Sequence, residues 1–302
     1  MNASSSELHL DLDGAWPQNA LTDGADYLDC REWGPPLRYS SIRACVEEFY
    51  EHVEKQLKPW TLYGSGDFHF LTALWLRRLD EPFTLITFDN HPDWDVRPPY
   101  WCCGTWINRA LDLPTLKKAA LWGCGNFELN WPHRMWANHK ALRTDRLHVW
   151  PWAERIEAST QKLWPGITRE NWKENFARFA QSLRRERVYV TVDFDCLAAG
   201  EAVTNWEQGL FHAEDVAWAL RELREHVEII GGDACGAYSP IKYARWKQRI
   251  EGTLDHPKEE EPVDVAEAAR VNLRALQKIW PALTGRDEHE PARDQQHTEP
   301  QI

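Results

Sequence analysis

Three potential metal ligands follow one apolar stretch of the chain at alternate positions. The stretch 83–88, Phe-Thr-Leu-Ile-Thr-Phe, is rich in β-branched and aromatic residues and predicts a buried strand, and Asp89, His91 and Asp93 come directly after it. Successive side chains of an extended chain point to opposite sides, so an extended continuation would turn all three ligands the same way. An ordinary polar loop after a buried strand is the alternative, because a single D-x-H-x-D pattern also arises by chance.

Two other predicted strand ends carry the same kinds of side chain. The apolar run 188–192 leads into Asp193 and Asp195, and the short run 62–63 opens into Gly-Ser-Gly, then Asp67-Phe-His69. Three strand ends that offer acids and imidazoles together are difficult to explain by packing alone. The sequence therefore predicts a metal site, with these six ligands: His69, Asp89, His91, Asp93, Asp193 and Asp195.

The residue types indicate which metal and which chemistry to expect. Four carboxylates and two imidazoles exceed the needs of one tetrahedral zinc ion, and no cluster of thiolates competes with them. An oxygen-rich site with two imidazoles suits Mn²⁺. Six ligands with bridging carboxylates suit two ions roughly 3.5–4 Å apart, which lower the pKa of a shared water and make hydroxide available near neutral pH. We therefore expect two Mn²⁺ ions and a hydrolytic reaction.

The elements that position these residues alternate between strands and helices. This order predicts an α/β fold with a mostly parallel sheet and helices on both faces, in which ligands bind beyond the carboxyl ends of the strands. Residues 14–39 read as loop. Strands are expected at 7–13, 62–63, 83–89, 119–123, 146–150, 188–192 and 227–230, and helices at 40–56, 70–79, 105–111, 171–183 and 213–225.

The character of the sequence changes near residue 255. We expect residues 1–255 to form the metallohydrolase domain and 256–284 a helical extension, with a helix from Pro262 to Trp280. Residues 285–302 are polar and contain proline, a composition that predicts a disordered tail.

Composition excludes several classes of function. The chain has 302 residues, 43% of them hydrophobic, and a formal net charge of −12, which argues against a nucleic-acid surface and suits a cationic substrate. No signal peptide and no membrane span is evident. Seven cysteines without a C-x-x-C pair predict reduced thiols in a cytoplasmic protein.

The three motifs resemble those of the arginase, or ureohydrolase, superfamily. Its G-G-D-H box corresponds to Gly-Ser-Gly-Asp-Phe-His at 64–69, its D-A-H-x-D box to 89–93, and its D-x-D box to 193–195. The segment 229–240 is similar to the family's G-L-D-x-x-E-x-N-P segment. The resemblance covers residues 60–240 and implies a three-layer α/β/α domain with a parallel sheet.

The resemblance also implies a role for each ligand. Asp89 and Asp193 would bridge the two ions, and Asp93 would accept the proton of the nucleophile and pass it to the leaving nitrogen. His91 is expected to be catalytic as well as a ligand. One ion would be held by His69, Asp89, Asp93 and Asp193, and the other by Asp89, His91, Asp193 and Asp195.

The sequence departs from the family at the groups that hold the substrate. Phe68 separates Asp67 from His69, so His69 is the expected ligand and Asp67 a structural residue. The loop 102–108 lacks the histidine found in enzymes that act on free arginine, and Gly236 stands where a glutamate would pair with the guanidinium. We considered four residues as substitutes in substrate binding, with a structural role as the alternative: Glu207, Asp233, Trp94 and Trp206.

An intact metal site without the grip for a free amino acid predicts a hydrolase whose substrate lacks a free α-amino acid head. The G-S-G-D-F-H and D-N-H-P-D-W boxes resemble those of the peptide arginases, which convert arginine in a peptide to ornithine and urea. We therefore expect a binuclear manganese hydrolase whose partner is an arginine-containing peptide or a small guanidino compound, and a homo-oligomer is possible within this family. Three alternatives remain: a ureohydrolase of a small guanidino or amidino compound, a zinc-dependent amide deacylase, and a non-catalytic metal-binding protein.

Overall fold

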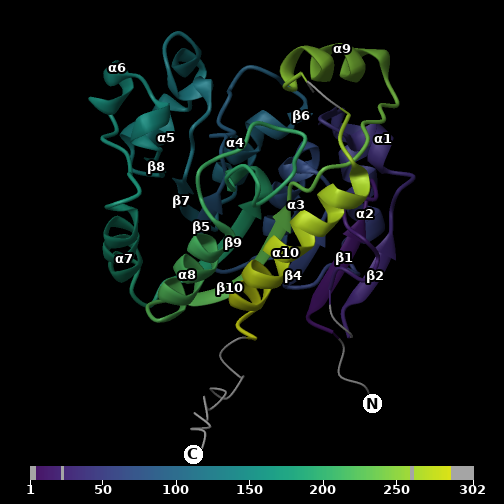
Figure 1. The fold of residues 1–302 in the computed structure, drawn as a ribbon, viewed down its shortest axis with the longest axis horizontal. Coiled ribbons are helices and arrows are strands. Elements are labelled where there is room, and N and C mark those ends of the chain that lie inside the picture. The colour runs from purple at the N-terminus through teal and green to yellow at the C-terminus, as the bar shows by residue number, and fades with distance from the viewer. Residues whose placement is uncertain (1–4, 22–23, 259–261, 287–302) are drawn as a thin grey trace, which may run out of the picture.

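A computed structural model describes residues 5–21, 24–258 and 262–286. Within them, a parallel sheet of eight strands forms the middle of the molecule, in the order β2-β1-β4-β10-β9-β5-β7-β8 (Figure 1). The strands span Glu7–Asp11 (β1), Asp26–Asp29 (β2), Trp60–Tyr63 (β4), Phe83–Phe88 (β5), Leu116–Trp122 (β7), Leu147–Trp150 (β8), Arg187–Asp193 (β9) and Glu228–Cys235 (β10).

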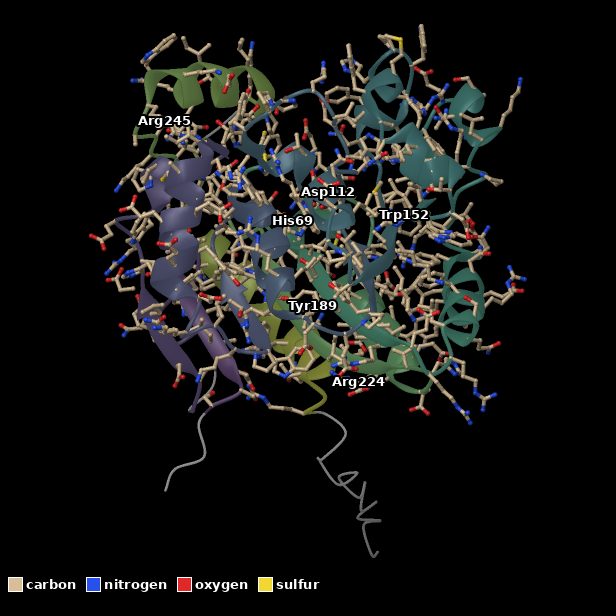
Figure 2. The ribbon with its side chains drawn as sticks, turned by 180° about the vertical axis from the view of Figure 1, so that it is seen from behind. His69, Asp112, Trp152, Tyr189, Arg224 and Arg245 are labelled. Carbon is tan, nitrogen blue, oxygen red and sulfur yellow. The ribbon has the colours of Figure 1, made fainter. Side chains whose placement is uncertain are left out.

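Helices cover both faces of the sheet. In Figure 1 the helices α7 (Trp172–Ser182), α8 (Ala213–Arg224) and α10 (Val265–Thr284) cover one face, and their apolar sides pack on alternate strand residues such as Ile86 and Val190. The view from behind in Figure 2 shows the opposite layer, which includes α2 (Arg43–Val53), α3 (Thr72–Trp75) and α4 (Trp106–Leu111). The expected three-layer α/β/α fold is therefore confirmed.

Shorter elements gather around these layers. They comprise the helices α1 (Gly34–Leu37), α5 (His139–Arg143), α6 (Ala158–Gln161) and α9 (Trp246–Asp255), the antiparallel pair β3 (Ser40–Ser41) and β6 (Trp101–Cys102), and the 3₁₀ turns Gly66–Leu71, Leu76–Arg78, Cys103–Thr105, Phe127–Leu129, His133–Trp136, Ala153–Arg155 and Phe194–Cys196.

The structure differs from the sequence expectations at several elements. Residues 26–29, expected in a loop, form the edge strand β2, and the helix expected at 70–79 consists of a short α-helix between two 3₁₀ turns. Strand β10 continues five residues beyond the expected end at 230, through a Gly-Gly-Asp sequence that has little strand propensity. Close packing explains the glycines, because a Cβ at Gly232 would lie 2.6 Å from the carbonyl oxygen of Val190.

The C-terminal helix was expected to end at Trp280 but continues through Pro281 to Thr284. It begins at Val265 rather than at Pro262, because the Asp264 carboxylate caps the backbone N–H groups of residues 266 and 267. The expected disordered tail lies outside the described residues, apart from 285 and 286. Among the described helices, none combines the length and apolarity needed to cross a bilayer.

Candidate metal centre

The sheet topology brings the three ligand segments to one place. Strands β4 and β5 follow each other in the sequence but are separated in the sheet by β10 and β9. The connections on the two sides of this point lead away from it in opposite directions, which opens a crevice beyond the carboxyl ends of the strands. The turn after β4 supplies His69, the loop after β5 supplies residues 89–93, and the end of β9 supplies Asp193 and Asp195.

The first group of ligands surrounds the ring of His69, near the centre of the molecule in Figure 2. The Nδ1 atom of His69 lies 3.0 Å from Asp89 Oδ2, and 3.4 Å from an Oδ2 atom of both Asp93 and Asp193. All four side chains are buried. Ligand atoms of His69, Asp89 and Asp93 all lie within 4.8 Å of one another, as do those of His69, Asp193 and Cys235, so these residues could hold a cation.

The second group of ligands shares Asp89 with the first. His91 Nδ1 lies 2.7 Å from Asp195 Oδ2 and 3.7 Å from Asp89 Oδ1, and ligand atoms of these three residues all lie within 4.8 Å of one another. The two oxygens of Asp89 thus face different groups, as a bridging carboxylate requires. Cys235 also contacts the first group, because its thiol donates to Asp193 Oδ2 over 3.5 Å, and no motif predicts this contact.

The hydrogen bonds of His69 favour a cation at Nδ1. Its Nε2 lies 2.9 Å from Thr191 Oγ1, and that hydroxyl donates to Asp233 Oδ1 over 2.5 Å, so Nε2 carries the proton. In the neutral ring Nδ1 is then an acceptor, buried among carboxylates that cannot donate to it, so it has no hydrogen-bond partner. A metal ion satisfies such an atom, and the residues present therefore fit a metal centre.

The carboxylates repel one another in the absence of a cation. Burial, reinforced by the charge of a neighbouring aspartate, raises the pKa of Asp93 to about 7, of Asp193 to about 8 and of Asp195 to about 6. Burial alone would lower the pKa of His69 and His91, but the surrounding carboxylates outweigh it and raise both. The cluster therefore retains protons near neutral pH, which divalent cations would displace.

The backbone reaches this arrangement in a way that the sequence analysis did not foresee. The extended conformation ends at Phe88, and Asp93 has a φ of 46°, in the left-handed region that aspartate tolerates better than most residues. Asp195 likewise lies in a 3₁₀ turn rather than in a strand. The indole N–H of Trp106 donates to Asp93 Oδ2 over 2.5 Å and fixes this carboxylate, while the same indole packs on His69.

Asp67 has partners of its own. Arg38 Nε donates to its Oδ2 over 2.6 Å, and His256 Nε2 lies 2.7 Å from its Oδ1. Both oxygens are occupied and buried, as expected for a structural residue.

One of the four proposed substrate-binding residues, Trp206, lines the pocket, where it packs edge-on against His91. Glu207 does not line it but contacts the same imidazole, with Oε2 3.4 Å from His91 Nε2. Asp233 requires a correction, because it is fully buried behind His69 and accepts hydrogen bonds from four hydroxyl groups. Trp94 also requires one, since it is buried against Trp164.

The pocket contains two acids that the sequence analysis missed. Glu128, in the loop after β7, and Asp255, at the end of α9, line it together with Gly104 and the ligands. Burial raises the pKa of Glu128 to about 8, although the charge of His91 opposes this. Neither acid stands in a recognisable motif, so only the fold reveals them.

The structure also explains the missing grip for a free amino acid. Gly236 has a φ of 103°, and a Cβ there would lie 2.1 Å from Asp193 Oδ1, so no glutamate fits at this position. Asn108 points away from the pocket, because its amide donates to the carbonyl oxygens of Trp94 and Asp95.

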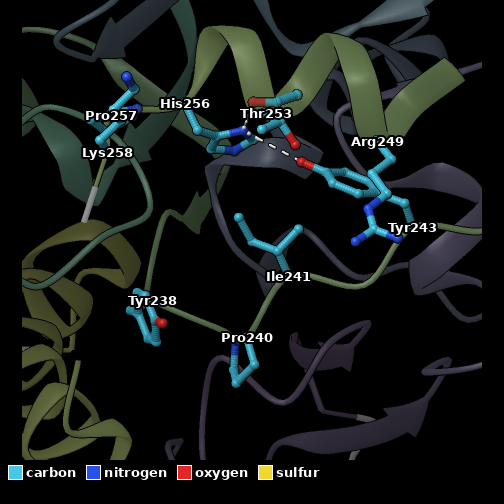
Figure 3. A pocket seen from close by; sticks show the side chains of 10 residues that line it. Tyr238, Pro240, Ile241, Tyr243, Arg249, Thr253, His256, Pro257 and Lys258 are labelled. Atoms are coloured by element: carbon cyan, nitrogen blue, oxygen red, sulfur yellow. Dashed lines mark hydrogen bonds between the residues drawn. The ribbon is translucent and has the colours of Figure 1, made fainter. Parts of the chain in front are cut away.

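A larger hollow of about 730 Å³ lies next to the centre, beneath α9 (Figure 3). Tyr243 and His256 contact each other across it at 3.4 Å. The ring of His256 also stacks on Trp206 at 4.2 Å, so this ring separates the hollow from the metal pocket. None of the proposed metal ligands lines the hollow.

Comparison with known proteins places the fold. No protein-family model matches the chain. An uncharacterized protein of Thermotoga maritima is 29% identical over 213 residues, which cover 70% of this chain and 71% of that protein. Similar solved structures include the arginase of Bacillus subtilis, with a TM-score of 0.53 and 13% identity, covering 90% of this chain and 97% of that one. The agmatine ureohydrolase of Thermoplasma volcanium is similar too, with a TM-score of 0.51 and 15% identity, covering 95% of this chain and 93% of that one.

The formiminoglutamase of Trypanosoma cruzi, whose structure contains Mn²⁺, is similar as well (TM-score 0.53, 11% identity, covering 94% of this chain and 95% of that one). At these identities the likeness concerns the fold, and it extends over almost the whole length of both chains. The order of the strands, the two helical layers and these structural neighbours together show that the chain has the same fold as the solved arginase, agmatine ureohydrolase and formiminoglutamase.

Proposed function

We propose that this chain is a metal-dependent hydrolase that breaks a C–N bond of a guanidino group. The observation that carries the proposal is the buried Nδ1 of His69, which lacks a hydrogen-bond partner and faces three carboxylates at the carboxyl edge of the sheet. Proteins of the same fold named arginase, agmatine ureohydrolase and formiminoglutamase support the reaction class.

The cofactor we propose is a pair of Mn²⁺ ions. Asp89 and Asp193 would bridge them, and the remaining donors are two imidazoles and two carboxylates, a set that suits manganese better than zinc. When bound, such a pair supplies a hydroxide nucleophile near neutral pH. The ligands of the first ion would be His69, Asp89, Asp93 and Asp193, and those of the second Asp89, His91, Asp193 and Asp195.

The chain's own side chains then orient the substrate and move the proton. Addition of water to the guanidino carbon and cleavage of its bond to the alkyl nitrogen give urea and an amine, which takes up a proton. We assign that proton transfer to Asp93, which Trp106 holds in place. His91, between Asp195 and Glu207, would orient the reacting groups from the opposite side of the pocket.

A peptidyl arginine is the substrate that the shape of the site favours. The metal pocket is small, about 30 Å³, and it adjoins a chamber of about 350 Å³ that shares Gly104, Glu128 and Asp255 with it. The inner pocket has room only for the tip of a side chain, so the end of a guanidinium would enter it while the alkyl stem and the peptide backbone occupy the chamber. The acids of the lining suit the positive charge.

Exposed apolar side chains flank this chamber. Trp246, Ile250 and Leu254 form a stripe along one side of α9, which packs on the chamber through Tyr100. A second group lies on the other side, near Arg97, whose guanidinium stacks on Trp136. Such surfaces mark sites of protein or peptide binding. The second group consists of Val96, Phe127, Trp131, Met135 and Trp136.

The decisive experiment is a urea assay on protein reconstituted anaerobically with Mn²⁺. The substrates are arginine-containing peptides, free arginine and agmatine, and Asp193→Asn serves as the inactive control. We expect urea from the peptides and little from free arginine. Turnover of agmatine alone would indicate a small guanidino substrate. One zinc ion per chain would indicate an amide deacylase, and two bound ions without turnover would indicate a non-catalytic protein.

The same preparation tests one further assignment. A homo-oligomer would bury the apolar groups beside the chamber, and the mass in solution would reveal it. All seven cysteines, which lie within the described residues, are free thiols. This state fits the reducing cytoplasm, where we place the protein.

A further inference from the structure

The side chain of Glu128 ends in an atom without a partner. Its Oε2 is shut off from solvent and accepts no hydrogen bond, whereas the backbone N–H of the same residue is capped by Asn126 over 2.9 Å. Within the described residues it is the only carboxylate with such a buried, unsatisfied oxygen. The residue as a whole is partly exposed, but an oxygen withdrawn from water without a donor is unfavourable, which points to a ligand at this atom.

The loop that carries Glu128 is fixed against the metal centre. The backbone N–H groups of Gly125 and Asn126 both donate to the carbonyl oxygen of Asn90, over 3.0 and 3.1 Å. The thiol of Cys124 donates to the carbonyl oxygen of His91 over 3.4 Å. Because Asn90 and His91 belong to the ligand loop after β5, the position of Glu128 is set relative to the ligands.

Glu128 lines the pocket together with all the acids of the metal centre. It also lines the outer chamber, so it stands where the small pocket opens into the larger space. A substrate side chain that reaches from the chamber to the ligands must pass it.

The other acids near the pocket are occupied or remote. Asp233 is buried behind His69 and satisfied by four hydroxyl groups. Glu207 faces the imidazole of His91 and is 45% exposed, and Asp255 accepts from the hydroxyl of Tyr39 over 3.1 Å. A glutamate at Gly236 is excluded by the clash with Asp193.

We infer that Glu128 is the carboxylate that pairs with the guanidinium of the substrate. The guanidinium presents two parallel N–H groups, and a carboxylate accepts both in a planar, charge-assisted pair. The donor that the buried oxygen lacks is then supplied by the substrate. Specificity for a cation with this planar shape comes from a loop after β7, rather than from the β10 segment in which Gly236 leaves no room for a side chain.

This inference takes its ligand from the proposed function, but its test does not require turnover. The probe is 1-butylguanidine, with butylurea as an uncharged compound of similar shape, and binding to the manganese-loaded protein is measured by calorimetry. Glu128→Gln keeps the size of the side chain and removes the charge. The matched control is Glu225→Gln, an exposed glutamate just after α8, at the opposite edge of the sheet.

We expect Glu128→Gln to weaken the binding of butylguanidine roughly 10- to 100-fold, with the metal content and the binding of butylurea unchanged. Glu225→Gln should bind like the wild-type protein. Equal affinity of Glu128→Gln and wild type for butylguanidine would overturn the inference, as would a wild-type protein that does not bind it at all.

A crystal of the wild-type protein with butylguanidine gives an answer that does not depend on how the variant folds. Guanidinium nitrogens within 3.2 Å of the Glu128 carboxylate support the inference, and a guanidinium paired only with Glu207 or Asp255 contradicts it. The urea assay separates the two proposals. Binding through Glu128 without urea release would refute the hydrolase alone, and urea release that Glu128→Gln leaves unchanged would refute the role of Glu128 alone.

Discussion

Thr191→Val should weaken manganese binding while leaving the fold intact. Thr191 touches no proposed ligand atom that faces a metal, but its hydroxyl accepts from Nε2 of His69 over 2.9 Å. The same hydroxyl donates a hydrogen bond to Asp233 Oδ1 over 2.5 Å. The hydroxyl thereby holds the histidine proton on Nε2 and keeps Nδ1 available as a ligand atom.

The magnitude follows from what valine removes. Valine has nearly the shape of threonine but offers no acceptor, so the buried N–H loses its partner, at a cost of about 1–3 kcal/mol. The proton can also move to Nδ1, where it competes directly with the metal. Loss of such an orienting group typically weakens metal binding roughly 10- to 100-fold, which corresponds to about 1.4–2.8 kcal/mol. Asp233 retains the hydroxyls of Tyr63, Thr72 and Tyr189, so we expect the fold to persist.

The assay is competition for Mn²⁺ with a chelator of known affinity, followed by measurement of the metal bound per chain. Thr191→Ser is the matched control, because serine restores the hydroxyl and should bind manganese nearly as the wild-type protein does. Thermal unfolding of the metal-free variants checks that both are folded. If Thr191→Val binds manganese with wild-type affinity, the hydroxyl does not set the protonation of His69 and our reasoning about Nδ1 is wrong.

Three further predictions concern the same centre. Gly236→Ala should lower the free energy of unfolding by about 2 kcal/mol or more and reduce metal content. Gly200→Ala is the control, because Gly200 has a similar positive φ but open space around it, so that only the backbone strain should lower its stability. Denaturant titration compares the two variants. Asp193→Asn should lose both ions and Asp195→Asn only one, as measured by metal analysis. The metal-free protein should unfold at lower temperature as the pH rises from 6 to 9, and Mn²⁺ should reduce this dependence, in thermal scans with and without a chelator.

The sign of the pH effect follows from the pKa values. Asp93, Asp193 and Asp195 have pKa values of about 7, 8 and 6 in the folded chain, all above those of an unfolded aspartate. Groups of this kind stabilise the fold while they are protonated, and this contribution is lost as the pH rises through the folded value. The raised pKa values of both histidines act in the same direction. A melting temperature that rises with pH in the metal-free protein would show that the carboxylates do not repel one another as described.

The residue types and their order along the chain were sufficient to predict the fold and the segments of the site. Strand β5 reads clearly because its residues are β-branched or aromatic, and β9 for the same reason. Asp93 shows where that reasoning was limited. The alternation of side chains along an extended chain correctly predicted that Asp93 faces the other ligands. The reason was wrong, because a left-handed backbone and the indole of Trp106 direct its side chain.

Other features depend on contacts between distant segments, which no local pattern records. Nothing around Glu128 marks it as a pocket residue, and its position depends on hydrogen bonds between its loop and Asn90, 38 positions earlier in the chain. Asp233 shows the opposite case. An acid next to a glycine pair resembled a substrate ligand in the sequence, but the parallel register of β10 and β9 places it beside Thr191, where it supports His69 from within the core.

The position of the site at the strand ends has a thermodynamic consequence. Strands β5 and β9, which pair directly in the core of the sheet, hold their terminal carboxylates together whether or not a cation is present. The free energy lost to repulsion and burial is therefore borne by the metal-free fold and recovered when cations bind. Metal binding therefore contributes to the stability of the fold, so the affinity for Mn²⁺ and the melting temperature should change together in any variant of Asp93 or Asp193. Variants at these two positions that separate the two quantities would show that the sheet, and not the metal, relieves the repulsion.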